Sequence, residues 1–213
     1  HTRRTKAFWN LPSIHFLGCA GHGIIMLFVV PLAVHKGLDL STAAWVLGII
    51  SLMSIPSRLL TPILAERYGP KPVMVACLAA QGLTVLYLFW AQSTWEFYLF
   101  AGIFGLGFGG EWTGYMVINR QYFGHGPMGT VYGWQMTGAL LGHAVISWIA
   151  GLMLDLTGSY NSILVLSIIA SMGGVVATLF LESTKSELIP DWEQSLPPEV
   201  RSRPPPEGRE NVA

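Results

Sequence analysis

Hydrophobic residues are arranged along this chain in six long runs, each separated from the next by a short polar segment. The runs cover about residues 14–36, 42–65, 73–92, 95–118, 130–154 and 161–181. Each is close to the roughly 20 residues that a helix needs to cross the hydrocarbon core of a bilayer. Because lipid offers backbone groups no water to bond, we predict an all-α membrane protein with six transmembrane helices.

Short polar segments between the runs contain the residues that favour turns. They read HKGLDLST, ERYGPKP, AQSTW, NRQYFGHGPMGT and DLTGSYNS. Gly, Pro, Asp, Asn and Ser stop helices and adopt turn geometry. From Glu182 onward, prolines and charges replace apolar residues, which is typical of a tail without a packed core. We therefore divide the chain into a cytoplasmic connector at 1–13, a six-helix transmembrane bundle at 14–182 and a disordered cytoplasmic tail at 183–213.

The composition also indicates an integral membrane protein. Of the 213 residues, 52% are hydrophobic and 11% are charged, whereas a soluble domain has roughly 25% charged residues. A secretory signal would be a single short apolar region, so six long runs predict a multi-pass protein, which we place in the cell membrane. The net charge of zero gives no reason to expect a nucleic-acid partner. The chain begins with His rather than Met, and we expect it to be a fragment.

Lysine and arginine residues predict the orientation of the bundle. Ten of the twelve lie before the first run, after the second or fourth run, or after the sixth. Short cytoplasmic loops collect Lys and Arg, so these positions predict that both termini are cytoplasmic. The two exceptions are Lys36, in a loop on the opposite side, and Arg58, inside a span.

Two ionisable residues lie deep inside the predicted spans. Arg58 is eight residues before Glu66, which places it about 12 Å into the helix at 1.5 Å per residue. Glu111 lies nine residues before Arg120 and therefore reaches a similar depth. An arginine near the centre of a bilayer costs roughly 2.5–3.5 kcal/mol, so we expect Arg58 to face water or a counter-charge.

Polar neighbours suggest what Arg58 faces. Ser51, Ser54 and Thr61 lie at helical spacing around it, a polar stripe suited to a cavity wall. Guanidinium pairs with both oxygens of a carboxylate. We therefore expect Arg58 to bind an organic anion, with Glu111 balancing its charge in the empty site or carrying a coupling proton. The alternatives are that Arg58 extends along its stem to the interface and that Glu111 serves helix packing.

Three further polar side chains are candidates for a transport pathway, namely His22, Gln135 and His143. His22 lies seven residues after His15, and His143 lies eight residues after Gln135, so each pair shares one helix face. Imidazoles could carry a proton or bond a substrate, or could be buried and bonded to a neighbouring helix. No two histidines have close ligand spacing with carboxylate support, so we expect no metal site and no cofactor.

Glycine and cysteine inside the spans are expected to serve packing. The 24 glycines cluster in stretches such as GIFGLGFGG and GALLG, and small residues let membrane helices approach closely. Cys19 and Cys77 both lie inside predicted spans. The sequence predicts that they are small buried residues without further chemistry.

At RLLTPILAERYGPKPVM the chain resembles the signature of the major facilitator superfamily, Gly-x-x-x-Asp-Arg-x-Gly-Arg-Arg, which lies between paired helices. Glu66 stands at the acidic position, Arg67 and Gly69 match, and Lys71 keeps one basic position, while Pro62 replaces the leading small residue. NRQYFGHGPMGTVYGW resembles the loop that enters the eleventh helix of that superfamily. The similarity covers about residues 7–182 and implies the carboxyl-terminal bundle of a twelve-helix carrier, with an amino-terminal six-helix half as its partner.

A further segment, GLMLDLTGSYNSILVL, is similar to the monocarboxylate and oxalate/formate carrier branch. This resemblance implies a secondary transporter of a small organic anion that uses a coupling proton or a counter-anion. An arginine of the eighth helix binds the anion in that branch, and Arg58 occupies the similar position. Relatives often carry an aspartate one turn earlier, where Ser54 stands here, which argues against proton coupling of that type.

The superfamily resemblance also implies a role for the charged loop residues. We expect Glu66, Arg67, Gly69, Lys71 and Arg120 to form a cytoplasmic gate, with salt bridges among the charged members that stabilise one state of the carrier. The alternative functions are a carrier of another solute, such as drug or sugar efflux, and, from other classes, an integral-membrane enzyme or a scaffold. The absence of a concentrated nucleophile or metal motif argues against an enzyme.

Overall fold

The protein is described here from a computed structural model in which residues 6–123 and 128–181 are placed. The start of the expected connector (1–5), part of the fourth connection (124–127) and the expected tail (182–213) lie outside the described residues. Within the described ranges, every regular element is helical, in agreement with the predicted all-α fold.

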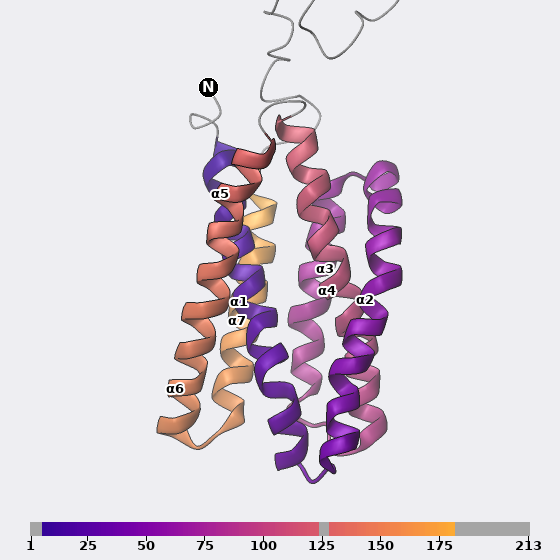
Figure 1. Ribbon diagram of the computed structural model, residues 1–213, viewed down its shortest axis with the longest axis vertical. Coiled ribbons are helices and arrows are strands. Elements are labelled where there is room, and N and C mark those ends of the chain that lie inside the picture. The colour runs from indigo at the N-terminus through magenta and orange to yellow at the C-terminus, as the bar shows by residue number, and fades with distance from the viewer. Residues whose placement is uncertain (1–5, 124–127, 182–213) are drawn as a thin grey trace, which may run out of the picture.

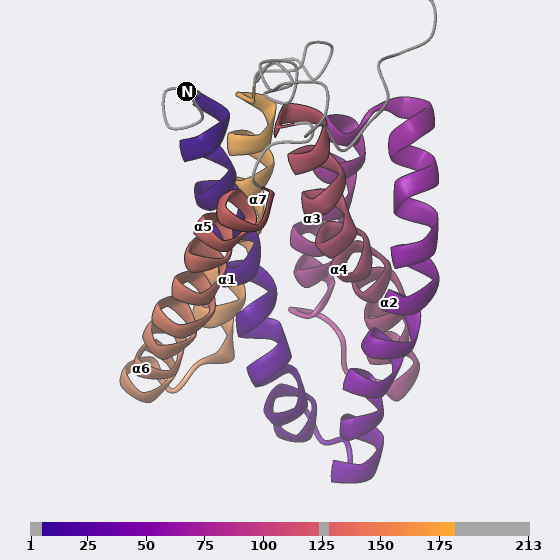
Figure 2. The same ribbon diagram turned by 45° about the horizontal axis from the view of Figure 1, so that its top comes forward.

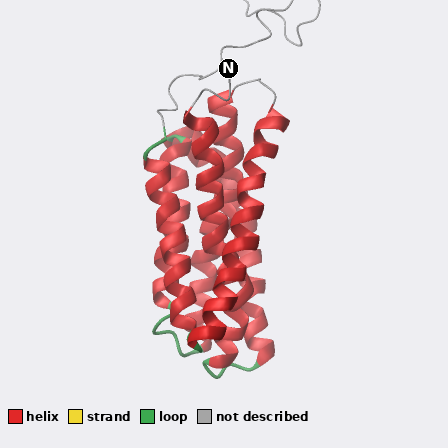
Figure 3. Cartoon of the chain, turned by 90° about the vertical axis from the view of Figure 1, so that its left-hand side faces the viewer, coloured by secondary structure: helices red, strands yellow, loops and turns green. Residues whose placement is uncertain are grey.

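The helical rods run up and down the bundle in chain order. They are α1 (Lys6–His35), α2 (Leu40–Tyr68), α3 (Pro70–Tyr87), α4 (Thr94–Phe123), α5 (Met128–Leu141), the π-helical turn η2 (Gly142–Ile146), α6 (Ser147–Thr157) and α7 (Tyr160–Leu179). In Figure 1, α5 and α6 form one long rod, with η2 inside it. Figure 3 shows the helices running roughly parallel to the long axis of the molecule.

Local sequence signals begin and end several helices. Asp39 caps the start of α2, where its carboxylate accepts a hydrogen bond of 3.0 Å from the N–H of Thr42. Gly69 joins α2 to α3 with a φ of 89°, a conformation that glycine adopts without a Cβ clash. Pro70 then opens α3, where a missing N–H costs nothing. Gly158 ends α6 in the left-handed conformation, and Ser159 caps α7.

The two ends of the bundle differ in charge. The start of α1, the α2–α3 junction and the end of α7 meet at the upper end in Figure 1, while the α1–α2, α3–α4 and α6–α7 connections meet at the lower end. Lys6, Arg67, Lys71 and Arg120 lie at the upper end, and Lys36 lies at the lower end. This arrangement agrees with the segregation of charge expected from the sequence, while the orientation in a membrane stays a prediction.

Two groups of helices make up the bundle. In Figure 2, α5 and α6 lie beside α1 and α7 on one side, and α2, α3 and α4 lie on the other. One buried cluster, which includes Ile50, Phe97 and Phe104, fills the lower half between α1, α2 and α4. A second cluster, which includes Leu11 and Tyr122, fills the upper half. Polar side chains occupy the level between these two clusters.

Glycines allow helices to touch through their backbones. A Cβ on Gly105 of α4 would lie 2.6 Å from the carbonyl oxygen of Ile50 in α2, and one on Gly109 would overlap the backbone of Ser54. Gly138 and Gly142 bring α5 and η2 against the carbonyls of Pro12 and Phe16 in α1 in the same way. The expectation that the glycine clusters serve close packing is confirmed at these contacts.

The first helix begins earlier than the hydropathy pattern predicts. α1 starts at Lys6 rather than near residue 14, and Ala7, Phe8 and Leu11 are buried. Asn10 and Pro12 interrupt the apolar run in the sequence, whereas in the structure this turn packs into the upper cluster. The described residues 6–13 are therefore part of the helical bundle and not a separate connector.

By length and apolar composition, four helices in the described residues could cross a membrane. They are Lys6–His35, Leu40–Tyr68, Gly129–Thr157 and Tyr160–Leu179. α3 begins with Pro70, Lys71 and Pro72, and α4 carries charges and many glycines, which lowers the apolar character of both. Membrane crossing by these two helices stays a prediction.

Candidate functional site

A buried carboxylate lies at the centre of the polar level of the bundle. Glu111 of α4 has no exposed surface. Its Oε2 accepts a hydrogen bond of 2.7 Å from Nε2 of Gln81 in α3 and lies 3.1 Å from Nδ1 of His22 in α1. Its Oε1 accepts a bond of 2.9 Å from the hydroxyl of Tyr115, one turn later in α4. One side chain therefore links three helices.

Glycine makes the space for this carboxylate. A Cβ on Gly18 of α1 would overlap Oε1 of Glu111 and would lie 2.9 Å from the hydroxyl of Tyr115. His15 and His22 flank Gly18 at spacings of three and four residues, and both are buried. The ring of His15 stacks on that of Tyr115 at a centroid distance of 3.8 Å. The predicted shared face of the two histidines is confirmed, and it faces α4.

Polar contacts continue from Tyr115 to α5. Asn119, one turn beyond Tyr115, donates a bond of 2.8 Å to the carbonyl of Tyr115 and a second bond to Oε1 of Gln135. Asn119 and Gln135 are both buried. The string Gln81, Glu111, Tyr115, Asn119, Gln135 thus crosses the bundle from α3 to α5.

Several buried polar atoms along this string have no hydrogen-bond partner within the described residues. They are Nδ1 of His15, Nε2 of His22, Oε1 of Gln81, Oδ1 of Asn119 and Nε2 of Gln135. Burying an amide or imidazole without a partner costs free energy. Such atoms are satisfied when water, a substrate or an ion occupies the space beside them.

His143 approaches the string from the long rod. It lies in η2, is half-buried, and its ring centroid is 4.9 Å from that of His22. The structure therefore brings together four predicted site residues, namely Glu111, His22, His143 and, through Asn119, Gln135.

Arg58 lies outside this group. It is exposed on α2, and no ion pair joins it to an acidic residue of the described chain. Ser57 and Thr61 on either side of it both face Gly110, so Arg58 lies at the level of Glu111, as expected. Glu111, however, points to α1 and α3. The expected pairing of Glu111 with Arg58 is absent in this structure.

The prediction that Ser51, Ser54 and Thr61 form one polar cavity wall beside Arg58 is wrong. Ser54 and Thr61 are buried against α4, whereas Ser51 is exposed. The hydroxyls of Ser54 and Thr61 donate to carbonyls of α2 itself, at 2.7 and 2.8 Å. The cause is the glycine pair at 109–110, which draws that face of α2 onto α4 and leaves Arg58 beside the contact.

Arg58 is also not among the residues that line the pocket between α2 and α3. Leu60 and Leu64 line an open pocket of about 610 Å³ that α2 shares with Val73 and Ala76 of α3. Arg58 precedes Leu60 by two residues, which is about 200° around a helix. Ser57 and Thr61, which lie about 100° and 60° from Arg58 around the helix, line the same pocket, so Arg58 is exposed beside the pocket and not within it.

Comparison with protein families identifies the chain. Residues 13–209 match the family described as Major Facilitator Superfamily. The chain belongs to this superfamily. A comparison with curated proteins finds no match. As a member of the Major Facilitator Superfamily, the protein is a transmembrane transporter.

Two of the loop positions that carried the superfamily resemblance, Lys71 and Arg67, make contacts within the bundle. Lys71 donates hydrogen bonds of 2.7 Å to the carbonyls of both Leu179 and Leu181, at the end of α7. The guanidinium of Arg67 lies 5.3 Å from the ring centroid of Tyr68. The salt bridges expected among Glu66, Arg67, Lys71 and Arg120 are not formed within the described residues, because Lys71 bonds carbonyls instead. A gating role stays a prediction.

Three members of the string were not among the predicted site residues of this superfamily chain: Gln81, Tyr115 and Asn119. Glu111, Tyr115 and Asn119 are spaced by four residues each and so share one face of α4. This spacing was a signal in the sequence. Gln81 had no comparable signal, because its link to Glu111 depends on how α3 packs against α4.

Proposed function

We propose that the protein is the carboxyl-terminal half of a secondary transporter that moves a small organic anion. The monocarboxylate and oxalate/formate carriers, which one segment of the chain resembles, are the branch that we propose for it. The observation that carries this proposal is the position of Arg58, an exposed cation in the middle of α2 at the level of Glu111.

The cost of placing arginine in a membrane supports this role. An arginine side chain that faces lipid near the bilayer centre costs roughly 2.5–3.5 kcal/mol. Ionisable residues in spans therefore usually face a bundle interface or a water-filled cavity. Arg58 is exposed beside the contact of α2 with α4 and does not line the pocket between α2 and α3, and a second six-helix bundle against this flank would enclose it in an aqueous pathway. A carboxylate substrate would then accept two parallel bonds from the guanidinium.

Charge balance defines the coupling that we propose. An anion carried alone would move net charge against or along the membrane potential, worth about 2.3 kcal/mol per charge at 100 mV. Carrying a proton with the anion, or exchanging one anion for another, removes this charge movement. We therefore propose proton symport or anion exchange, with Ser54, His22, Gln135, His143 and Glu111 near the pathway.

Uptake of a radiolabelled monocarboxylate into proteoliposomes tests the role of Arg58. We expect Arg58→Lys to lower uptake by about 10–100-fold, because it keeps the charge but removes a bidentate bond worth roughly 1.5–3 kcal/mol. Lys6→Arg, which also keeps the charge and lies exposed at the start of α1, is the control and should retain uptake. The full carrier, with its amino-terminal half, is used for all variants.

Two outcomes would contradict this proposal. Unchanged monocarboxylate uptake by Arg58→Lys would mean that the guanidinium reaches the interface along its stem instead of binding substrate. Transport of a neutral sugar or a drug, insensitive to Arg58, would assign another solute. Protection of Arg58 from a guanidine-modifying reagent by the anion is expected if the proposal is correct.

A further inference from the structure

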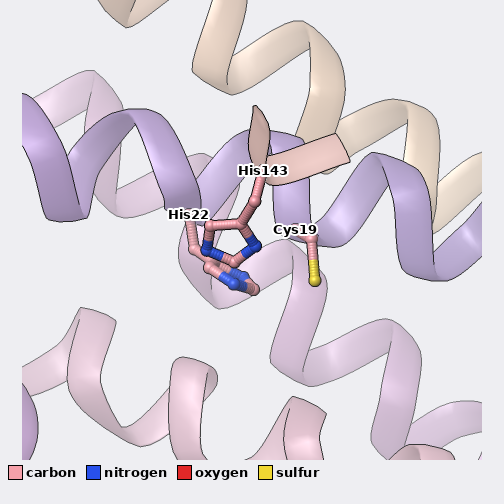
Figure 4. A group of neighbouring side chains, drawn as sticks. All are labelled: Cys19, His22 and His143. Atoms are coloured by element: carbon pink, nitrogen blue, oxygen red, sulfur yellow. The ribbon is translucent and has the colours of Figure 1, made fainter. Parts of the chain in front are cut away.

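One thiol and two imidazoles meet beside Glu111. Cys19 and His22 of α1 and His143 of η2 each offer one ligand atom, and these atoms all lie within 4.8 Å of one another. Figure 4 shows the three side chains converging from the two helices. Cys19 and His22 are each 1% exposed, whereas His143 is half-buried.

Backbone contacts hold the two helices in this register. Cys19 and His22 are three residues apart and therefore share a face of α1. Gly138 and Gly142 place α5 and η2 directly on the carbonyls of α1. A Cβ on Gly23 would lie only 3.0 Å from Cδ2 of His143. His143 thus rests against the next turn of α1, close to both other ligands.

Glu111 prepares His22 to act as a ligand. Nδ1 of His22 lies 3.1 Å from Oε2 of Glu111, while Nε2 is buried and has no hydrogen-bond partner in the described chain. Histidines that bind metal usually donate their other ring N–H to a carboxylate, which fixes the tautomer and the ring orientation. His22 has this arrangement, with its Nε2 lone pair left free.

We propose that Cys19, His22 and His143 form a binding site for a thiophilic transition-metal ion, for which Zn²⁺ is the best-matched probe. One sulfur and two imidazole nitrogens suit Zn²⁺ and Cu⁺, whereas Mg²⁺ and Ca²⁺ require oxygen ligands. On binding, the thiol proton leaves to solvent and the sulfur forms the metal bond. Glu111 is a positioning residue that acts through His22.

The geometry needs only a small adjustment. Tetrahedral Zn²⁺ with bonds of about 2.0–2.3 Å places its ligand atoms roughly 3.3–3.8 Å apart. The three ligand atoms would each move inward by about 1 Å or less, which is within the reach of small torsion changes inside one rotamer well. Three protein ligands leave a fourth position open, and the exposed part of His143 marks the side from which an ion would enter.

The sequence predicted no metal site, because no two histidines have ligand spacing along the chain. His22 and His143 are 121 positions apart in the numbering, and only the α1–η2 contact brings them together. A bound ion would link these two helices. The proposal goes beyond transport of an organic anion and does not depend on it.

Titration of the purified full chain with Co²⁺ and Zn²⁺ tests the site. We expect one equivalent of Co²⁺ to bind with thiolate-to-cobalt charge-transfer absorption and the intense visible bands of tetrahedral coordination, and Zn²⁺ to displace it. Cys19→Ser should abolish the charge-transfer band. His143→Gln and Glu111→Gln should weaken binding, the latter by about 10–100-fold as for other carboxylates behind a ligating histidine.

Matched controls use the remaining cysteine and an exposed histidine. Cys77→Ser and His35→Gln should bind Co²⁺ as the unchanged protein does, since neither belongs to the cluster. The proposal is overturned if the unchanged protein gives no charge-transfer band at saturating Co²⁺, a result that needs no variant to fold. It is equally overturned if Cys19→Ser retains the band. Neither result bears on the role of Arg58 in transport.

Discussion

At the scale of single residues, the site depends on a carboxylate and on the glycine that faces it. Glu111 is fully buried and has partners on α1, α3 and α4. Its side chain fits between these helices because Gly18 has no Cβ. A change at Gly18 therefore acts on the whole polar string without removing any of its polar groups.

Replacing Gly18 with alanine should destabilise the protein by about 1–3 kcal/mol, the usual cost of overpacking a filled interior. The added methyl group would overlap Oε1 of Glu111 and press on the hydroxyl of Tyr115. Thermal unfolding of the detergent-purified variant measures this loss as a lower melting temperature.

Gly102 of α4 provides the matched control, because a Cβ there meets nothing within 4 Å. Gly102→Ala should leave stability unchanged or raise it by up to about 1 kcal/mol, the difference in helix propensity. Equal melting temperatures for Gly18→Ala and Gly102→Ala would contradict the packing of Glu111 against α1.

At the scale of elements, irregular turns place the functional side chains. The rod from α5 to α6 contains a π-helical turn at Gly142–Ile146, and such turns often occur at functional sites. The extra residue in this turn changes which side chains face α1. His143 lies in the turn and meets His22, a contact that a regular helical repeat does not predict.

The residue that caps α2, Asp39, leads to a second prediction about the helices. Hydrogen bonds from the side chain and the N–H of Thr42 lower the pKa of Asp39 below its ordinary value. The carboxylate therefore stabilises the folded protein fully above pH of about 4, and this contribution is lost as the pH falls through the lowered pKa. We expect Asp39→Ala to lower the melting temperature at pH 7 more than at pH 3.

The variant Asp39→Asn distinguishes the effect of the negative charge from the effect of the capping hydrogen bond. Asp39→Asn keeps an oxygen that accepts from Thr42 N–H but does not titrate. Its melting temperature relative to Asp39→Ala should therefore stay nearly constant between pH 3 and pH 7. The first comparison is the unchanged protein against Asp39→Ala, and the second is Asp39→Asn against Asp39→Ala. If the difference in melting temperature depends on pH equally in both, Asp39 is not the titrating group.

At the scale of the whole molecule, the alternation of connections predicts the membrane topology. Ser41 lies near the lower end of the bundle and Tyr68 near the upper end, and both are exposed. Following the charge asymmetry, we expect a membrane-impermeant maleimide to label Ser41→Cys in intact cells. Tyr68→Cys should be labelled only after the membrane is permeabilised.

The labelling experiment can be done without first removing the two native cysteines. Cys19 is buried and Cys77 is partly buried inside the helices, so the parent protein should show little labelling and serves as the control. Labelling of Tyr68→Cys in intact cells, with none at Ser41→Cys, would reverse the predicted orientation.

Much of the helical framework was predictable, because each helix carries its own signals. Apolar runs gave the helices, and Asp39, Gly69 and Gly158 mark helix ends by local chemistry that no distant residue alters. The start of α1 was placed too late, since its burial depends on packing in the upper cluster. For the site, depth along the helix placed Glu111 and Arg58 at one level, but their directions were not predictable.

The helical class, the separation of charge between the two ends and the superfamily signature follow from the amino-acid sequence, because they depend on composition and on short-range order. The packing of the helices was needed to show that Glu111 joins His22, Gln81 and Tyr115 and not Arg58. It also decided that Cys19 and His22 meet His143. These contacts depend on where glycines let one helix backbone touch another, and a linear pattern does not specify which pairs of helices will meet there.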